Sequence, residues 1–303
     1  MPTPAEKRAT FHKFHAQGCF VIPNPWDVGS ARYLQGLGFK ALASTSAGFA
    51  FTQGLPDGGV SRAMMLAHFR EIAAATDVPV NADFEGGFAD APEGVAESVK
   101  LCIETGVAGL SIEDSTSDPA IPLYDFELAL ARVRAARAAV DEADGDVVFT
   151  ARSEGFIRGK PDLDETVRRL KAFAAAGADC LYAPGIRTRE QIAAVVKAVA
   201  PKPVNFLMSS ATELTVNDLA SLGVRRISLG GTLARVGWTA VVRAARDIAT
   251  AGKPCGEGGE VRERAIGHVG PDVIVALDGI PQGRVVTLRQ SFDVPMAAIE
   301  HDR

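Results

Sequence analysis

The sequence has few of the features that mark cysteine metal sites, secreted proteins or membrane proteins. Its four cysteines, Cys19, Cys102, Cys180 and Cys255, lie far apart and share no metal-ligand spacing, so we expect ordinary buried thiols. No apolar stretch approaches the roughly 18 residues that a membrane span requires. The polar segment Met1–Gln17 contains no apolar core of a signal peptide. We therefore expect a cytoplasmic protein that makes no membrane contact.

Positive charge is also scarce. The chain has 32 Lys and Arg residues against 37 Asp and Glu residues, with a net charge of −5 and a pI near 5.6. Its aromatic residues, 7% of the chain, are not interleaved with Lys and Arg, so we expect no binding of nucleic acid. The five histidines fall in helical patterns or in the C-terminal tail, and the sequence contains no Ser-His-Asp or Cys-His arrangement for nucleophilic catalysis.

What the sequence does contain is a regular alternation of short β-rich runs and amphipathic stretches. Eight strands are predicted, at Cys19–Pro23, Ala41–Ser46, Val78–Asp83, Gly109–Glu113, Val147–Arg152, Cys180–Ala183, Pro203–Met208 and Arg226–Leu229. Eight helices are predicted after them, at Val28–Leu37, Ser61–Ala75, Glu93–Glu104, Glu127–Val140, Leu163–Ala175, Arg189–Val199, Val216–Leu222 and Leu233–Thr250. A helix over Ala5–Ala16 precedes the first strand. This pattern predicts a (β/α)8 TIM barrel, with an open doubly wound sheet as the alternative.

The pattern ends after Lys253, and we assign residues 1–253 to the catalytic barrel domain. Residues 254–303 are predicted to form a linker and a C-terminal arm or hairpin. The linker is the glycine-rich run Pro254–Glu260, and the hairpin strands would be Asp272–Leu277 and Arg284–Leu288. An arm that reaches across a partner subunit and a loosely packed tail are both compatible with this pattern.

Four acidic residues stand at or near the ends of three successive predicted strands. They are Asp57, Asp83, Glu85 and Glu113. Because the carboxyl ends of parallel strands meet at one rim of a barrel, these side chains are expected to gather where TIM-barrel enzymes have their active sites. Hard oxygen ligands of this kind suit Mg²⁺, with Mn²⁺ as the alternative ion.

Other strand ends supply groups that would bind an anion. Arg152 ends the fifth predicted strand, and its forked guanidinium matches a carboxylate or phosphonyl group. The amides of Ser46, Ala47 and Gly48 would bind the remaining oxygens, as oxyanion donors do. A divalent cation, a small-residue loop and one arginine would together hold a small 2-oxo carboxylate.

Each of these residues also has a purely structural interpretation. Asp57 would serve as a turn residue after Pro56, Arg152 would bridge the strand-end carboxylates, and Ser44–Ser46 would form a plain β-turn. The joint occurrence of acids at three successive strand ends, with an arginine at the end of the fifth strand, favours a metal site over these structural interpretations.

These motifs resemble those of the isocitrate lyase/phosphoenolpyruvate mutase superfamily, from about residue 11 to about residue 250. The segments that carry the resemblance are Asn-Pro-Trp-Asp-Val-Gly-Ser-Ala (24–31), Ser-Thr-Ser-Ala-Gly (44–48), Gly-Leu-Pro-Asp (54–57), Asn-Ala-Asp-Phe-Glu-Gly-Gly (81–87), Ser-Ile-Glu-Asp (111–114) and Thr-Ala-Arg (150–152). The resemblance implies a barrel whose last helix is often exchanged between subunits of a homodimer or homotetramer.

The resemblance also implies roles for individual residues. Asp83 would bind Mg²⁺ directly, Glu85 and Glu113 would act through water, and Asp57 would lie nearby. The family usually has Asp where this chain has Glu85. We assign catalysis to Asp57 and Arg152. Substrate binding is assigned to Trp26, Ser46, Ala47, Gly48, Asp83, Arg152 and Asn205.

The chain departs from the family in the residues that select the reaction. The lyases carry a Lys-Arg-Cys-Gly-His loop after the fourth strand, whereas residues 114–124 here contain neither Cys nor Lys. The lyase glutamate after the sixth strand is replaced in Ala183-Pro184-Gly185. We therefore expect a Mg²⁺-dependent lyase that cleaves or decarboxylates a small oxaloacetate-like 2-oxo acid through an enolate. The alternatives are C–P bond chemistry of the mutase or hydrolase type, and a catalytically weak barrel that binds a 2-oxo acid.

Overall fold

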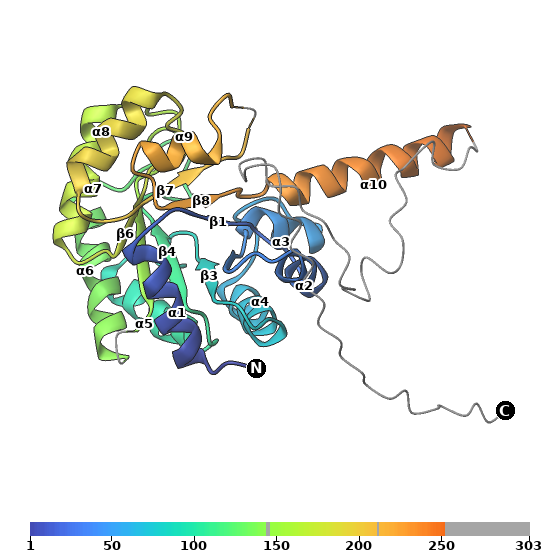
Figure 1. Cartoon of the computed structure of the whole chain (residues 1–303), viewed down its shortest axis with the longest axis horizontal. Coiled ribbons are helices and arrows are strands. Elements are labelled where there is room, and N and C mark those ends of the chain that lie inside the picture. The colour runs from blue at the N-terminus through green and yellow to red at the C-terminus, as the bar shows by residue number, and fades with distance from the viewer. Residues whose placement is uncertain (144–145, 211, 252–303) are drawn as a thin grey trace, which may run out of the picture. The chain divides into compact units, whose positions relative to one another are not determined.

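The strands form one parallel sheet that curls into a barrel (Figure 1) in the computed structural model, which describes residues 1–143, 146–210 and 212–251. The eight strands follow the order β1-β8-β7-β6-β5-β4-β3-β2, and every neighbouring pair is parallel. β1 and β2 are the two ends of this order. Between them the backbone N–H of Ala43 donates to the carbonyl of Pro23 at 3.0 Å, which brings the two edge strands together. The strands are β1 Phe20–Ile22, β2 Leu42–Ala43, β3 Val80–Asp83, β4 Gly109–Glu113, β5 Val148–Arg152, β6 Cys180–Tyr182, β7 Val204–Leu207 and β8 Arg226–Ser228. The (β/α)8 barrel that the alternating pattern predicts is therefore confirmed.

Most helices follow the strands and cover the outside of the sheet, whereas the last helix extends away from it (Figure 1). Their bounds are α1 Pro4–Ala16, α2 Val28–Gly36, α3 Ser46–Thr52, α4 Arg62–Ala75, α5 Pro92–Ile103, α6 Phe126–Glu142, α7 Leu163–Ala175, α8 Arg189–Val199, α9 Val216–Ser221 and α10 Thr232–Ala251. No helix of the described residues has the length and apolar character needed to cross a membrane.

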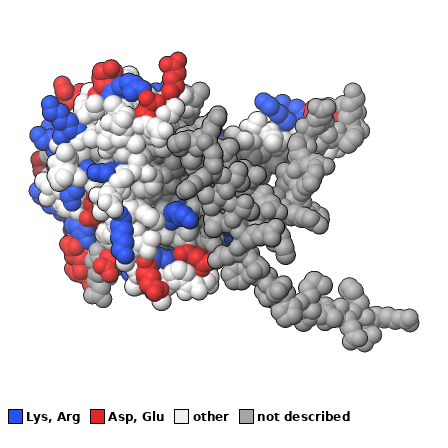
Figure 2. All heavy atoms as spheres, in the orientation of Figure 1, with Lys and Arg blue, Asp and Glu red and all other residues white. Residues whose placement is uncertain are grey.

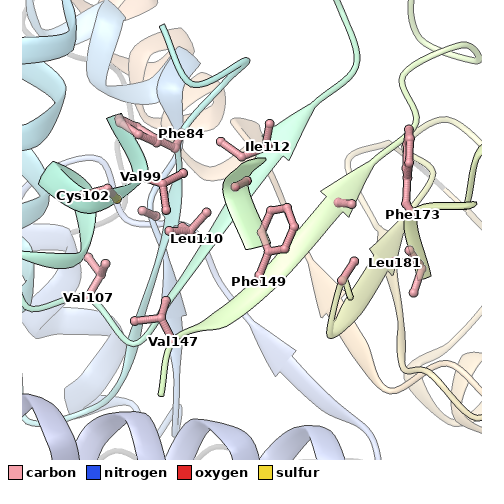
Figure 3. Packing of buried hydrophobic residues seen from close by; sticks show 14 of the residues in the cluster. Phe84, Val99, Cys102, Val107, Leu110, Ile112, Val147, Phe149, Phe173 and Leu181 are labelled. Carbon is pink, nitrogen blue, oxygen red and sulfur yellow. The ribbon is translucent and has the colours of Figure 1, made fainter. Parts of the chain in front are cut away.

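The main hydrophobic core lies between the strands and these helices (Figure 3). In α5, the apolar side chains of Val95, Val99 and Cys102 recur at helical spacing and are completely buried. They belong to the same cluster as Leu110 of β4 and Phe149 of β5. The buried face of α5 thus fixes the adjacent strands in place, and with them the residues at the strand ends.

A second cluster closes the amino-terminal side of the barrel. Phe11 of α1 is fully buried and packs with Ala41, Ala108 and Val148, which lie at the beginnings of β2, β4 and β5. The space is tight, because a Cβ atom added at Gly109 would come within 2.5 Å of the Phe11 ring. With α1 over this side, the C-terminal ends of the strands are left to form the functional face.

One local prediction was wrong. The predicted strand Ala41–Ser46 ends at Ala43, and Ser46 begins the helix α3 instead of a small-residue loop or a β-turn. Thr45 is the N-cap, and its hydroxyl accepts a hydrogen bond from the amide of Gly48 at 3.2 Å. The cap explains why a run of Ser and Thr is followed by helix.

Several other predictions can be compared with the described residues. Cys102 and Cys180 are buried thiols, as expected, whereas Cys19 is only partly buried. The predicted linker and hairpin of residues 254–303, with Cys255, lie outside the described residues, and so does the domain boundary at residue 253. On the face seen in Figure 2, the coloured basic and acidic side chains are interspersed, and neither sign dominates a region of that face.

Candidate active site at the carboxyl ends of the strands

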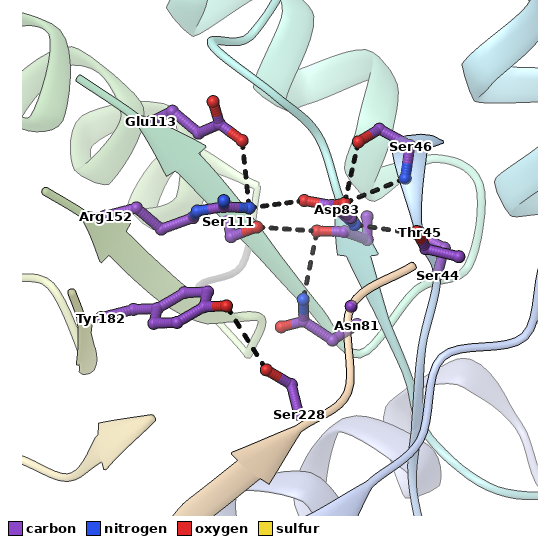
Figure 4. Close-up of polar contacts among 12 residues, drawn as sticks. Ser44, Thr45, Ser46, Asn81, Asp83, Ser111, Glu113, Arg152, Tyr182 and Ser228 are labelled. Carbon is purple, nitrogen blue, oxygen red and sulfur yellow. Dashed lines mark hydrogen bonds and ion pairs between the residues drawn. The ribbon is translucent and has the colours of Figure 1, made fainter. Parts of the chain in front are cut away.

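Four neighbouring strands bring polar residues to one cavity. Asp83, Glu113, Arg152 and Tyr182 are the last residues of β3, β4, β5 and β6. The sheet register pairs Glu113 with Arg152, and Arg152 with Tyr182. All four line a cavity of about 350 Å³, a volume typical of small-molecule sites. Figure 4 shows the side chains of Asp83 and Glu113 directed at Arg152, and the Tyr182 hydroxyl directed at Ser228.

Arg152 is the centre of a buried ionic network. Its Nη1 lies 2.7 Å from Asp83 Oδ1 and 3.0 Å from Glu113 Oε1, and its Nε donates to Glu154 Oε1 at 2.8 Å. Burial alone would lower the pKa of Arg152, but the carboxylates of Glu113, Glu154 and Asp83 raise it well above its ordinary value. Nη2 has no hydrogen-bond partner among the described residues, which leaves it as the donor for a ligand in the cavity.

Asp83 is held on its other side by α3. Its Oδ2 accepts hydrogen bonds from the amide and the hydroxyl of Ser46, at 2.9 and 3.1 Å. Burial raises the pKa of Asp83, while the charge of Arg152 lowers it. The amide of Ser46, which we expected to bind substrate oxygens, is thus occupied by Asp83. The Gly48 amide bonds Thr45, so Ala47 keeps the one amide of the three without a partner among the described residues.

Glu85 has an unusual backbone and an unsatisfied side chain. Its φ is +48°, in the left-handed region that non-glycine residues seldom occupy. Its Oε1 is buried and has no hydrogen-bond partner. Burial raises the pKa of Glu85 to about 8, and the neighbouring charges of Asp83 and Glu113 add to the increase. Negative charge is therefore crowded and uncompensated at this position.

These residues fit a divalent cation, on two observations. The donors are hard carboxylate oxygens, and the unsatisfied Oε1 of Glu85 together with the raised pKa values of Glu85 and Asp83 marks a position where positive charge is missing. Within the described residues, no group of three or more acidic, histidine or cysteine side chains is arranged so that it could hold a metal ion by itself. An ion bound here would keep several water ligands, as Mg²⁺ usually does.

A second cavity of about 540 Å³ adjoins the first. The two cavities share Ser46, Asp57, Glu113 and Arg158 in their linings. Ser115, on the loop after β4, lines the second cavity and donates to Glu113 Oε2 at 2.7 Å. Glu113 therefore faces both cavities and contacts groups from each.

The loop after β4 is anchored rather than open. The guanidinium of Arg132 lies 4.0 Å from the centre of the Tyr124 ring, and the Tyr124 hydroxyl donates to Asp90. At the start of the loop, buried Asp114 accepts from Arg169 Nη1 at 3.1 Å and from the amide of Glu154 at 2.8 Å. The segment that replaces the lyase Cys loop is thus held to α6, to α7 and to the turn after β5.

Of the remaining predicted site residues, three line the cavity and two do not. Ala47 and exposed Asp57 line the cavity. Asn205 also lines it, but its amide is engaged with Ser228 Oγ at 2.9 Å and with Arg226 Nε at 2.8 Å. Trp26 and Gly48 lie behind the cavity wall, where a Cβ added at Gly48 would come within 2.9 Å of Trp26 Cβ.

Four charged residues that line the first cavity were not predicted, namely Glu154, Arg158, Arg226 and Arg235, and the first two contact the ionic network of Arg152 and Glu113. Glu154 is 1% exposed, lines the first cavity and has a buried Oε2 without a partner. Its position two residues after Arg152 in the chain was the signal that could have identified it. Arg158 lines both cavities, and nothing in its local sequence distinguishes it from other surface arginines.

Known proteins resemble this chain over most of its length. A family model described as phosphoenolpyruvate phosphomutase matches residues 11–249. The oxaloacetate decarboxylase of Paraburkholderia xenovorans is 34% identical over 223 residues, which cover 70% of each chain.

Solved structures are similar as well. A protein from Burkholderia cenocepacia, described provisionally as a lyase/mutase, has a TM-score of 0.84 and 44% identity, and the match covers 87% of this chain and 95% of that one. Oxaloacetate acetylhydrolase, solved with its product oxalate, has a TM-score of 0.78 at 27% identity, with 87% and 94% of the two chains covered.

Proposed function

Because the chain belongs to the isocitrate lyase/phosphoenolpyruvate mutase superfamily, we propose that it is a Mg²⁺-dependent lyase that breaks a C–C bond of a small 2-oxo acid. The reaction would be decarboxylation or retro-aldol cleavage of an oxaloacetate-like substrate. The observation that carries the proposal is the convergence of Arg152 with Asp83 and Glu113 in one cavity, beside the unsatisfied carboxylate of Glu85. Similarity to an oxaloacetate decarboxylase supports the same substrate class.

Asp83, Glu85 and Glu113 would hold the cation. When bound, it would act as a Lewis acid that neutralises the negative charge developing on the 2-oxo oxygen as the C–C bond breaks. The carboxylates of Asp83 and Glu113 stay fixed, because Ser46 holds the first and Ser115 holds the second. Fixed charges of this kind need no reorganisation during the reaction.

Arg152 and Ala47 would bind the substrate carboxylate. The free Nη2 of Arg152 supplies a charge-assisted hydrogen bond, and the Ala47 amide in the first turn of α3 supplies another donor. Asp57, which is exposed and lines both cavities, remains our candidate for moving a proton at the reacting carbon.

C–P bond chemistry is the second candidate, favoured by the family model described as phosphoenolpyruvate phosphomutase. Against it stands the segment 114–124, which lacks the gating Lys and Asn residues of the mutase type. A phosphonate would also be accommodated by Arg152, since its guanidinium binds either anion.

A substrate panel tests the proposal. The protein would be incubated with Mg²⁺ and, separately, oxaloacetate, phosphonopyruvate and methylisocitrate, while pyruvate, phosphate and succinate are measured. We expect pyruvate from oxaloacetate. Turnover of phosphonopyruvate alone would overturn the lyase proposal in favour of C–P chemistry. Binding of the acids without any product would identify a binding protein.

A further inference from the structure

Arg158 lies where the two cavities meet. It is carried by the turn after β5, in which the amides of Ile157 and Arg158 both donate to the carbonyl of Glu154 at 3.0 Å. Its Nη2 donates to Ser115 Oγ at 3.2 Å and lies 3.5 Å from Glu113 Oε2. Its side chain is 44% exposed, and its Nε and Nη1 have no hydrogen-bond partner among the described residues. The guanidinium is thus tethered on one side and open on the other.

The charge of the second cavity makes Arg158 unusual. Four carboxylates line that cavity, those of Asp57, Glu85, Asp90 and Glu113. Arg158 is the one cationic side chain among the described residues that line it. An anionic group that entered this space would be repelled by the carboxylates unless it paired with Arg158.

Arg158 and Arg152 share one carboxylate. Arg152 Nη1 lies 3.0 Å from Glu113 Oε1, and Arg158 Nη2 lies 3.5 Å from Glu113 Oε2. The two guanidinium groups therefore contact the two oxygens of one carboxylate, that of Glu113, which lines both cavities. A short diacid, with two carboxylates separated by two or three carbon atoms, would reach both guanidinium groups.

We infer that Arg158 is the receptor for a second anionic group of the substrate and selects 2-oxo diacids over 2-oxo monoacids. This inference rests on the proposed function, because the 2-oxo carboxylate end of the ligand is taken to bind at Arg152. The Nε and Nη1 atoms of Arg158, which have no hydrogen-bond partner among the described residues, form the subsite, and Ser115 fixes the orientation of its guanidinium.

The test uses matched pairs of ligands that differ only in the second carboxylate. Oxaloacetate and 2-oxobutanoate form a four-carbon pair, compared through the KM of the first and the inhibition constant of the second. The stable five-carbon pair 2-oxoglutarate and 2-oxopentanoate is compared by calorimetry in Mg²⁺ buffer, which needs no turnover. For the wild type we expect each diacid to bind about 10- to 100-fold more tightly than its monoacid, as a charge-assisted hydrogen bond allows.

Arg158→Gln should abolish this preference. We expect KM and Kd of the diacids to rise about 10- to 100-fold, while the constants for the monoacids change less than about threefold. Arg158→Lys should restore part of the preference, since it keeps the charge but not the fork. Arg189→Gln is the matched control, because Arg189 is 50% exposed and pairs with Asp218 at 2.6 Å away from both cavities. It should leave all constants unchanged.

The outcomes separate this inference from the proposed function. Equal weakening of diacid and monoacid in Arg158→Gln would overturn the inference and assign Arg158 a structural role. Equal affinity of the wild type for both members of each pair would also overturn it, while the lyase proposal would stand. Failure of the wild type to bind any of the four acids would overturn both.

Discussion

Arg152 faces more negative charge than it can compensate. Its guanidinium contacts the carboxylates of Asp83, Glu113 and Glu154, and all four side chains are largely withdrawn from solvent. Even with Arg158 beside Glu113, three ionised acids would leave a surplus of negative charge in a low-dielectric site, which is costly unless it is neutralised. A divalent cation or a proton would remove that surplus, and the two alternatives can be separated by experiment.

Asp83→Asn tests the cation. The amide keeps the shape of the side chain but removes the charge and weakens the oxygen as a ligand. Loss of an indirect metal partner lowers metal affinity about 10- to 100-fold. We expect the Mg²⁺ affinity of Asp83→Asn, measured by calorimetry, to fall by more than this. Pyruvate release from oxaloacetate should be lost at the same time.

The control for this variant is Asp141→Asn. Asp141 also pairs with an arginine, Arg137, at 2.6 Å, but its side chain is 64% exposed on α6. It should leave Mg²⁺ affinity unchanged. Unaltered Mg²⁺ affinity in Asp83→Asn would show that Asp83 is not the metal ligand.

A buried histidine gives a stability prediction at the same scale. His68 stacks on Phe49 with ring centres 3.9 Å apart, and its Nε2 is buried without a partner. Burial lowers the pKa of His68 to about 4. In the unfolded chain its pKa is about 6.5, so between these values the unfolded state binds more protons than the folded state. Stability contributed by neutral His68 is present above pH 6.5 and is lost as the pH falls toward 4.

His68→Phe should remove this dependence. The free energy of unfolding, measured by urea denaturation from pH 7 to pH 4, should fall less steeply in the variant. The two slopes should differ by up to about 1.4 kcal/mol per pH unit. Equal slopes in the variant and the wild type would contradict the assignment of His68 as a histidine that is neutral in the folded protein.

At the scale of elements, α3 depends on a close approach at Gly48. A Cβ atom at this position would lie 2.6 Å from Thr45 Cγ2, 2.9 Å from Trp26 Cβ and 3.1 Å from Ala234 Cβ. Gly48→Ala should therefore destabilise the protein by about 1–3 kcal/mol, because the N-cap residue and α10 would have to shift. Thermal unfolding would measure this loss, and the displaced α3 should also raise the KM for substrate.

Gly29→Ala in α2 is the matched control. Its added Cβ would meet only Asp27 Oδ1, at the ordinary distance of 3.5 Å. Alanine is the better helix former, so this variant should be neutral or more stable by up to about 1 kcal/mol. Destabilisation of both variants to the same extent would contradict the packing argument.

The elements that were predicted well are those with a strong internal pattern. The bounds of β4, α7 and α8 agree with the prediction residue for residue, because each combines a run of buried apolar residues with a clear cap or turn. α3 was missed because Ser and Thr favour turns as well as N-caps. The seven residues Ser46–Thr52 carry too short a pattern to decide between them.

The site residues were likewise predicted only in part. Asp83, Glu113 and Arg152 could be placed from the sequence because they end strands of a parallel barrel. The occupation of the Ser46 amide by Asp83 could not, because it depends on the packing of α3 beside β3. Arg158 was missed for a similar reason, since the turn that carries it has no periodic pattern.

At the scale of the whole molecule, α10 carries an apolar face that the described residues do not cover. Trp238 and Val241 are 40% and 56% exposed, and Val242 and Ile248 are 49% and 54% exposed. Their spacing places all four on one side of the helix. Burial of one such side chain contributes about 1.5–3 kcal/mol. We propose that a second copy of the chain covers this face, in the homodimer or homotetramer that the family resemblance implies.

Val242→Glu should break this association, because burial of an unpaired carboxylate in the contact is strongly unfavourable. Light scattering after size exclusion should give the wild type a mass two or four times its 31.8 kDa chain mass, and the variant a smaller mass. Ala240→Glu adds the same charge to the opposite side of α10, at another exposed position, and should leave the mass unchanged. A wild type of single-chain mass would contradict the proposal. Equal dissociation of both variants would show that the added charge, rather than the loss of the apolar face, separates the subunits.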